Sequence, residues 1–277
     1  MAYKLIEGGG VTTPKGFLAG ACYVGVKSRK SEKPDVAIIY SEQPASCAAM
    51  FTTNKFCAAP VILDREILKK GKARAVVINS GNANAATGEQ GIKDAKTVET
   101  EAEKLLGLGE DEVFVCSTGV IGQKLPVEKV LEGVRRIVPD MSVEKGTDAA
   151  WAIMTTDLVK KEVAYELELS GGTIRIGACA KGSGMIHPNM ATMLAYITTD
   201  AKIDAAVVQP MLKASTDKSF NMMTVDGDTS TNDSLFLLAN GASGVAVETE
   251  ADKAAFAEIL DMICMDMARR IASDGEG

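Results

Sequence analysis

The sequence of 277 residues predicts a layered α+β fold and not a doubly wound parallel sheet. Several expected strands follow one another before each helix, whereas a parallel sheet alternates strands with helices. The nucleotide-binding patterns GxxxxGK(S/T) and GxGxxG, the latter between a strand and a helix, are both absent. A chain of this length can form one large domain or two ordinary ones.

The N-terminal half opens with turn residues at 7–16, after which apolar patterning defines the elements. Apolar runs indicate strands, and apolar residues spaced three or four apart indicate helices. Pro126 suits the first turn of a helix, and Gly71 suits the end of one. Strands are therefore expected at 17–26, 35–41 and 73–80 and at the start of 112–122, with helices at 62–71, 89–106 and 126–137.

The C-terminal half begins with an expected hairpin at 163–180, because both arms alternate around Gly171-Gly172. A loop at 181–189 precedes a strand at 191–199, and Asp204 is expected to cap a helix that reaches Ser219. The segment 234–247 is apolar and strand-like. A last helix is expected at 249–271, with Phe256, Ile259, Leu260, Ile263 and Met267 facing inward.

The charge balance argues against nucleic-acid and membrane partners. Thirty Lys and Arg residues against 37 Asp and Glu residues leave a net charge of −7, without a basic cluster for phosphate backbones. The longest uncharged stretch, Gly182–Thr199, is interrupted by polar residues, and the N-terminus lacks the apolar core of a secretory signal. Six cysteines without a CxxC pair indicate reduced thiols. A cytoplasmic location is therefore expected.

The histidine count restricts the chemistry. His187 is the single histidine, so His-rich metal sites and any Ser-His-Asp triad built on another residue are excluded. His187-Pro188 is most simply a turn. No metal site is expected, and a general base in this protein is expected to be another group.

Four segments rich in small polar residues follow or precede expected strands, at 80–88, 117–122, 180–193 and 224–233. Loops at strand ends commonly carry binding and catalytic groups. Thr118-Gly119 is either a plain turn or an oxyanion hole, and Lys181 either reaches solvent or is held for an anion. The acidic residues of 224–233 do not match a calcium loop, so a hydrogen-bonded acidic turn is expected.

These segments together resemble one family. STGVIG at 117–122, KGSGMIHPNMATMLAYITTDA at 181–201, SFNMMTVDGDTSTNDS at 219–234 and the terminal DGEG are similar to the ornithine acetyltransferase (glutamate N-acetyltransferase) family. The similarity extends from GVTTPKGF near the start to Gly277. It implies a helix–sheet–sheet–helix sandwich of the kind found in self-processing aminopeptidases.

The resemblance implies a self-cleaving acyltransferase of arginine biosynthesis that moves an acetyl group from N-acetylornithine to glutamate. Cleavage would fall between Ala191 and Thr192. It would give an α chain of residues 1–191 and a β chain whose N-terminal part is residues 192–277. Family members continue well beyond DGEG, so the last part of the β chain is expected to be missing here. No cofactor is implied, although some members accept acetyl-CoA, and the expected assembly is α₂β₂.

The same resemblance assigns the site residues. Thr192 would be the nucleophile, and Thr118 and Gly119 would stabilise the oxyanion. Thr155, Lys181, Thr192 and Glu276 match the substrate-binding positions of the family. Lys181 suits the substrate α-carboxylate, and Glu276 suits the ornithine ammonium, which leaves glutamate to bind without that contact.

Two other functions remain open from the sequence. A hydrolase of the same architecture would resolve the acyl-enzyme with water, as a terminal-Thr amidohydrolase or aminopeptidase. A chain without the family's C-terminal portion could also be an inactive ligand-binding fragment.

Overall fold

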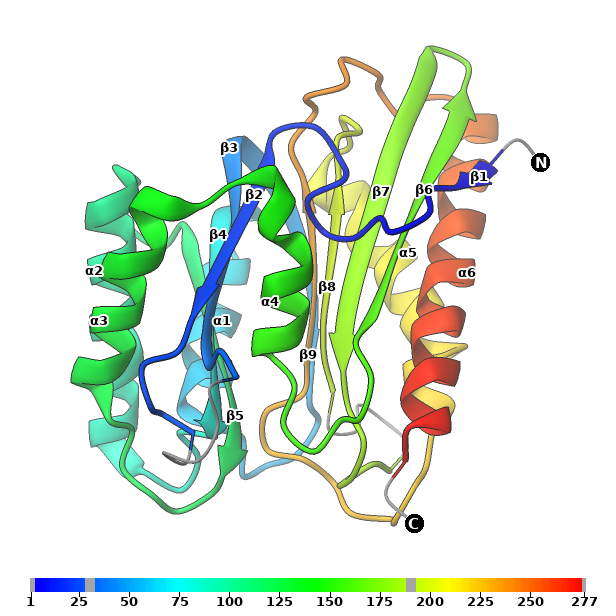
Figure 1. Ribbon diagram of the computed structural model, residues 1–277. Coiled ribbons are helices and arrows are strands. Elements are labelled where there is room, and N and C mark those ends of the chain that lie inside the picture. Colours follow the sequence, from blue (N-terminus) through cyan, green and yellow to red (C-terminus); the bar gives the residue numbers. More distant parts are fainter. Residues whose placement is uncertain (1–2, 28–32, 188–192, 276–277) are drawn as a thin grey trace.

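The computed structural model describes residues 3–27, 33–187 and 193–275. Its strands are β1 (Tyr3–Leu5), β2 (Phe17–Cys22), β3 (Val36–Phe51), β4 (Lys72–Asn82), β5 (Val113–Val120), β6 (Lys161–Leu169), β7 (Gly172–Lys181), β8 (Leu194–Thr199) and β9 (Ser234–Ala239). Its α-helices are α1 (Ala59–Leu68), α2 (Gly88–Leu106), α3 (Val127–Ile137), α4 (Gly146–Ala152), α5 (Ala205–Asp217) and α6 (Glu250–Ser273), as Figure 1 shows.

The strands form one continuous hydrogen-bonded path in the order β1-β6-β7-β8-β9-β3-β4-β5, and β2 pairs with β3. The long strand β3 joins two halves of this sheet. Its first part lies between β2 and β4, and after a register shift between Tyr40 and Ala45 its second part pairs with β9. The sheet can therefore bend at β3, and its two halves face each other (Figure 1).

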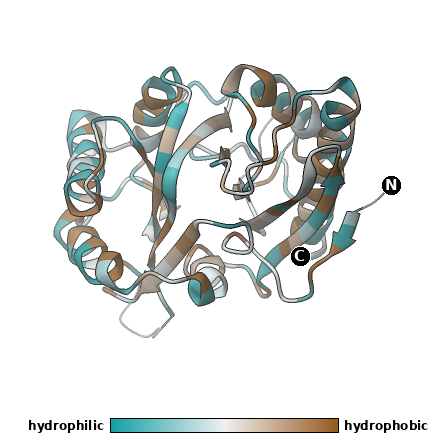
Figure 2. Cartoon of the chain, turned by 90° about the horizontal axis from the view of Figure 1, so that it is seen from above, coloured by the Kyte–Doolittle hydropathy of each residue, from teal (hydrophilic) through white to brown (hydrophobic). Residues whose placement is uncertain are grey.

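Three apolar layers confirm the expected helix–sheet–sheet–helix sandwich. The first lies between the β2–β5 half and helices α2 and α3, and the third lies between the β6–β9 half and helices α5 and α6. The middle layer joins the inner faces of the two halves and includes residues of α4. Seen from above, polar and apolar positions alternate along the outer helices, as expected for helices with one buried face (Figure 2).

Strand β9 shows why these layers form. Leu235 and Leu237 lie in the layer beneath α5 and α6, whereas Phe236 and Leu238 lie in the middle layer. Successive side chains of a strand point to opposite faces, so a strand between two apolar layers must be apolar throughout. The mainly apolar composition of residues 234–239 therefore reflects the position of β9 between two apolar layers.

Several expectations for the elements were confirmed. The expected hairpin is formed by β6 and β7, although its turn is Ser170-Gly171 and not Gly171-Gly172, because Gly172 pairs with Leu169 as the first residue of β7; the inward-facing residues named for α6 are all buried. Asp204 occupies the N-cap position of α5, although its side chain makes no capping hydrogen bond.

Other expectations for the elements were wrong. The strand expected at 35–41 continues to Phe51, because residues 46–51, beyond the exposed stretch at 42–44, pair with β9. The strand-like segment 234–247 ends as a strand at Ala239, because Gly241 and Gly244 adopt left-handed backbone conformations with φ of +69° and +77°. The first strand stops at Cys22 and not at residue 26.

The segment that follows the proposed cleavage point lies in the middle of the sheet. β8 pairs with β7 on one side and with β9 on the other, and β9 pairs with β3. No helix among the described residues is long and apolar enough to cross a membrane. The six cysteines are free thiols.

Candidate active site

A cavity of about 600 Å³ lies where the ends of β4, β5 and β7 meet the loop after α4. Four of the predicted site residues line it, namely Thr118, Gly119, Thr155 and Lys181. They come from positions up to 63 residues apart in the sequence and reach the cavity from both halves of the sheet. The fold therefore brings together residues that the sequence could only propose separately.

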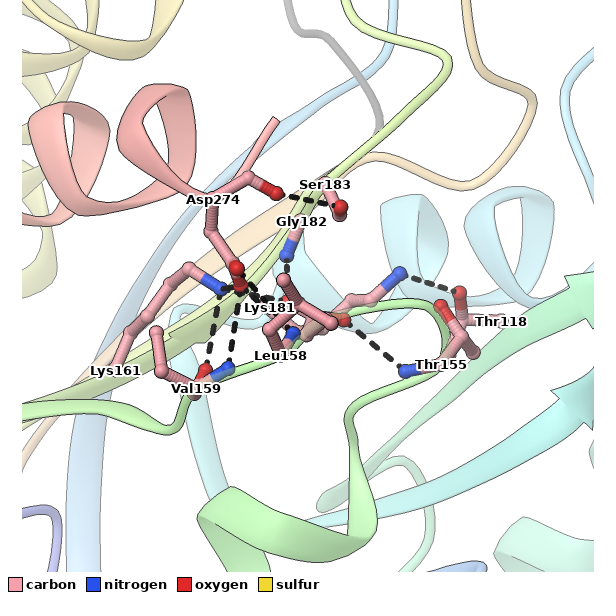
Figure 3. Close-up of polar contacts among 10 residues, drawn as sticks. Thr118, Thr155, Leu158, Val159, Lys161, Lys181, Gly182, Ser183 and Asp274 are labelled. Atoms are coloured by element: carbon pink, nitrogen blue, oxygen red, sulfur yellow. Dashed lines mark hydrogen bonds and ion pairs between the residues drawn. The ribbon is translucent and has the colours of Figure 1, made fainter. Parts of the chain in front are cut away.

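Lys181 is held inside this cavity and does not extend into solvent. It is only 3% exposed, and its Nζ donates a hydrogen bond of 3.2 Å to Thr118 Oγ1 (Figure 3). Lys181 is the last residue of β7, and Thr118 belongs to β5, so the bond crosses between the two halves of the sheet. The sequence interpretation in which Lys181 reaches solvent is therefore wrong, and the alternative, a cation held for an anion, stays a prediction.

Gly119 is required by a close approach of two strands. Its φ is +134°, and a Cβ atom at this position would lie 2.3 Å from the carbonyl carbon of Gly81. The residues Gly81 and Gly119 are paired in register and both line the cavity. A side chain at 119 would force β4 and β5 apart and change the cavity wall.

A buried ion cluster supports the cavity from below. Lys161 Nζ contacts Asp157 Oδ1 at 2.8 Å and Asp274 Oδ2 at 2.5 Å, and all three side chains are 5% exposed or less. Asp157 also accepts hydrogen bonds from the backbone N–H groups of Thr155 and Gly182, at 3.1 and 2.7 Å. This one carboxylate therefore fixes the loop that carries Thr155 and the residue after Lys181.

Asp274 ties the end of α6 to the same place. Its carboxylate accepts from the backbone N–H groups of Leu158 and Val159, and its carbonyl oxygen accepts from Ser183 Oγ at 2.6 Å (Figure 3). Burial alone would raise the pKa of Asp157, but Lys181, Lys161 and the backbone donor hold that pKa below its ordinary value. The cluster therefore contains two carboxylates and one ammonium, with Lys181 as a further nearby cation.

The predicted nucleophile Thr192, its neighbour Ala191 and the predicted ligand Glu276 lie outside the described residues. The described neighbours of two of them are firmly held. Asp274, two residues before Glu276, is anchored in the ion cluster beneath the cavity. Met193, which directly follows Thr192, is 1% exposed.

Met193 is fixed through both of its backbone groups. Its N–H donates to Asp233 Oδ1 at 3.0 Å, and its carbonyl oxygen accepts from Ser234 N at 3.2 Å. The next residue, Leu194, pairs in register with Lys181 of the cavity wall. Burial raises the pKa of Asp233 to about 8, so this carboxyl is mostly protonated at neutral pH.

Lys27 also lines the cavity, although no sequence pattern predicts it as a site residue. Its Nζ donates to the carbonyl oxygens of Pro34 and Ala152 at 3.0 and 3.1 Å. Burial and the nearby cations Lys33 and Lys181 lower the pKa of Lys27 to about 7. No motif marks this residue, because its partners are spread over the sequence.

The acidic segment at 224–233 forms the expected hydrogen-bonded turn. Asp226 accepts from the backbone N–H groups of Met185, Ile186 and Asp228, and Asp226 and Asp228 line the cavity. Among the described residues no group of three His, Cys, Asp or Glu side chains has the arrangement of a metal site. His187 is exposed and is not among the cavity-lining residues.

Comparison with known proteins places the chain in a family. The ArgJ family model matches residues 18–277, nearly the whole chain. The chain belongs to the ArgJ family. The arginine biosynthesis bifunctional protein ArgJ of Symbiobacterium thermophilum is 50% identical over 271 residues, which cover 97% of this chain and 67% of that relative. The chain thus spans about two thirds of the length of the curated ArgJ relatives that it matches.

Two solved structures are similar to the chain at different levels. A chain of the ornithine acetyltransferase of Mycobacterium tuberculosis, solved with ornithine, is 40% identical with a TM-score of 0.61 and covers 68% of this chain and 98% of its own length. The L-aminopeptidase D-Ala-esterase/amidase of Ochrobactrum anthropi has a TM-score of 0.58 over 95% of this chain and 85% of its own, at 9% identity. The second likeness concerns the fold alone, a variant of the Ntn-hydrolase fold.

Proposed function

We propose that this ArgJ-family chain carries the acetyl-transfer site of an arginine-biosynthesis enzyme, which moves an acetyl group from N-acetylornithine to glutamate. The observation that carries the proposal is the single cavity that gathers Thr118, Gly119, Thr155 and Lys181 next to the β8 residue Leu194. The membership in the ArgJ family and the likeness to an ornithine acetyltransferase support the same reaction.

Thr192 would act as both nucleophile and base. Cleavage before Thr192 frees an α-amine, whose pKa is about 7.7–8.0 in model compounds. At neutral pH part of this amine is unprotonated and can accept the proton of the Thr192 hydroxyl as the hydroxyl attacks the acetyl carbonyl. Ornithine leaves, and the amine of glutamate then attacks the acetyl ester in the second half of a ping-pong cycle.

The remaining residues would bind and stabilise. The Thr118 hydroxyl and the backbone N–H of Gly119 would stabilise the oxyanion of each tetrahedral intermediate. Lys181, buried beside Thr118, would bind the α-carboxylate that both substrates carry. Thr155 would line the substrate site, and Glu276 would bind the ornithine ammonium.

The fold is compatible with cleavage between Ala191 and Thr192. β8 and β9 follow the proposed cut and pair with β7 and β3, which precede it, so the α chain of residues 1–191 and the β chain from 192 would stay interlocked. The Mycobacterium tuberculosis chain supports this proposal, because it is matched almost completely yet covers 68% of 277 residues, or about 188. That length is close to the expected α chain.

The wider assignments follow from the family. We propose an α₂β₂ assembly, a cytoplasmic location, no cofactor and acetyl-CoA as a candidate co-substrate. Free thiols at all six cysteines agree with a reducing compartment.

The experiment measures ornithine release from N-acetylornithine by the full-length protein, with and without glutamate. Acetyl transfer predicts sustained release only with glutamate, with acetylglutamate formed in equal amount, whereas without glutamate release stops after one ornithine per acetylated Thr192. Equal release without glutamate would show the hydrolase that the aminopeptidase-like fold allows, and no release would show a binding protein. Thr192→Ala should abolish the reaction, whereas Thr192→Ser, which keeps a hydroxyl, should retain part of it.

A further inference from the structure

The proposed reaction sets a recognition problem at the side-chain end of the substrate. N-acetylornithine and glutamate share an α-carboxylate but end in groups of opposite charge, an ammonium and a carboxylate. One cavity must therefore accept a cation in the first half-reaction and an anion in the second. Glu276 is expected to suit the ornithine ammonium, and a fixed carboxylate there would repel glutamate.

The cavity offers two lysines among its described lining residues, Lys27 and Lys181. Lys181 Nζ lies 3.2 Å from Thr118 Oγ1, at the expected oxyanion position. The α-carboxylate is attached to the carbon that bears the reacting nitrogen, so it must also lie close to that position. Lys181 therefore suits the α-carboxylate, and Lys27 is left for the more distant side-chain group.

Lys27 is held in place by contacts of its backbone and its side chain. Its N–H donates to Asp35 Oδ2 at 3.0 Å, and its backbone packs so closely on Gly81 that a Cβ there would lie 2.9 Å from Lys27 N. Its Nζ donates to Pro34 O and to Ala152 O, the carbonyl at the end of α4. An ammonium has three hydrogens, so these two bonds leave one for a ligand in the cavity.

The surroundings of Lys27 allow both protonation states near neutral pH. Burial is the main cause of its lowered pKa, the cations Lys33 and Lys181 add to it, and the anions Asp35 and Asp157 oppose it. Among the lining residues that the structure describes, the carboxylates Asp226 and Asp228 are the other charged groups of the wall. With a pKa of about 7, the amine can gain or lose a proton at little cost in free energy when a charged ligand arrives.

We propose that Lys27 is the specificity residue for the side-chain end of both substrates, as an ammonium that binds the side-chain carboxylate of glutamate and as a neutral amine that tolerates the ammonium of N-acetylornithine. The proposal rests on the proposed function. Lys27 releases its proton to solvent when the donor binds and takes one from solvent when glutamate binds. No other group needs to change, because the bonds to Pro34 and Ala152 are compatible with either state.

The test measures the two half-reactions separately with the full-length protein, by following the acetylated chain by mass spectrometry. Lys27→Met keeps the stem but removes the charge, and it should lower kcat/KM for deacetylation by glutamate about ten- to a hundredfold while acetylation by N-acetylornithine changes about threefold or less. Lys27→Arg keeps a permanent charge, so it should lower kcat/KM for acetylation by N-acetylornithine more than kcat/KM for deacetylation by glutamate. Lys104→Met, an exposed lysine on α2, is the matched control and should change neither half-reaction.

The unsubstituted protein provides a second measurement that needs no variant. The ratio of kcat/KM for glutamate to that for norvaline, an acceptor without the side-chain carboxylate, should fall as the pH rises through about 7, because Lys27 loses its charge. The α-amine of the acceptor titrates in both cases and cancels in the ratio. In Lys27→Arg the ratio should not change across this pH range.

The outcomes separate the two proposals. Equal losses in both half-reactions for Lys27→Met and Lys27→Arg, or a ratio that does not change with pH in the unsubstituted protein, would overturn the role of Lys27 while leaving the acetyl transfer intact. If the unsubstituted protein forms no acetyl-enzyme at all, the proposed function itself is wrong, and the specificity proposal falls with it.

Discussion

Replacing Lys161 with methionine tests the buried ion cluster beneath the cavity. Lys161→Met keeps the volume of the stem but removes a cation that contacts both Asp157 and Asp274. The two carboxylates are 0% and 5% exposed, so water cannot replace the lost ammonium. The expected result is a large loss of stability and of activity together.

The magnitude follows from what each carboxylate retains. Breaking a buried ion pair by removing one partner costs about 3–5 kcal/mol, because a charge stays buried without compensation. Asp157 keeps the backbone donors of Thr155 and Gly182, and Asp274 keeps those of Leu158 and Val159. We therefore expect the lower end, about 3 kcal/mol, which corresponds to a fall in Tm of roughly 6–12 °C for a protein of this size.

The loss of stability in Lys161→Met is expected to depend on pH. In the unsubstituted protein the pKa of Asp157 is lowered on folding, so its contribution to stability is present above the unfolded pKa and is lost as the pH falls through the folded pKa. Without Lys161 the folded pKa of Asp157 rises, because a cation that lowers it is removed, and this favours the protonated form of Asp157. The difference in stability between Lys161→Met and the unsubstituted protein should therefore shrink as the pH falls from 7 to 5.

Thermal unfolding followed by circular dichroism at both pH values is the assay. Lys160→Met, an exposed neighbour on the same segment, is the control and should change Tm very little. A Lys161→Met protein that melts within about 2 °C of the control at pH 7 would refute the view that this cluster supports the site.

Three further substitutions test other parts of the account. Gly119→Ala should lower both Tm and turnover, because its Cβ would lie 2.3 Å from the carbonyl carbon of Gly81; unchanged melting would contradict the close approach. Thr118→Val removes a hydrogen bond to Lys181 and a proposed oxyanion donor, so kcat should fall about a hundredfold with little change in Tm, and a normal kcat would exclude the role. For Asp64→Asn, denaturant titrations should show that the free energy of unfolding rises relative to that of the unsubstituted protein as the pH rises. Burial raises the pKa of the Asp64 carboxyl, so folding favours its neutral form, and the unsubstituted protein loses stability at higher pH.

The elements that could be predicted from the sequence are those whose pattern is local. Helix α6 was expected because Phe256, Ile259 and Ile263 recur at helical spacing and meet one apolar layer. Helix α4 was not expected, because Gly146–Ala152 is a short run of mainly small residues without a clear apolar stripe. Its position depends on packing in the middle layer, which no local pattern records.

The site residues likewise fall into those that a sequence motif predicts and those that only the tertiary structure reveals. Thr118, Gly119, Thr155 and Lys181 could be proposed because they lie in or match family motifs, and the cavity contains all four. Lys27 could not be proposed, since its contacts are made with Pro34, Gly81 and Ala152, far apart in the sequence. The pairing of Lys161 with Asp274, 113 residues away, is likewise a product of the tertiary fold.

Intact mass of the full-length protein, before and after a brief exposure to N-acetylornithine without glutamate, tests the central proposal most directly. The account predicts two fragments, one ending at Ala191 and one beginning at Thr192, with a single acetyl group appearing on the second and disappearing when glutamate is added. A fully active protein that remains one uncut chain, or an acetyl group located on any residue other than Thr192, would contradict it.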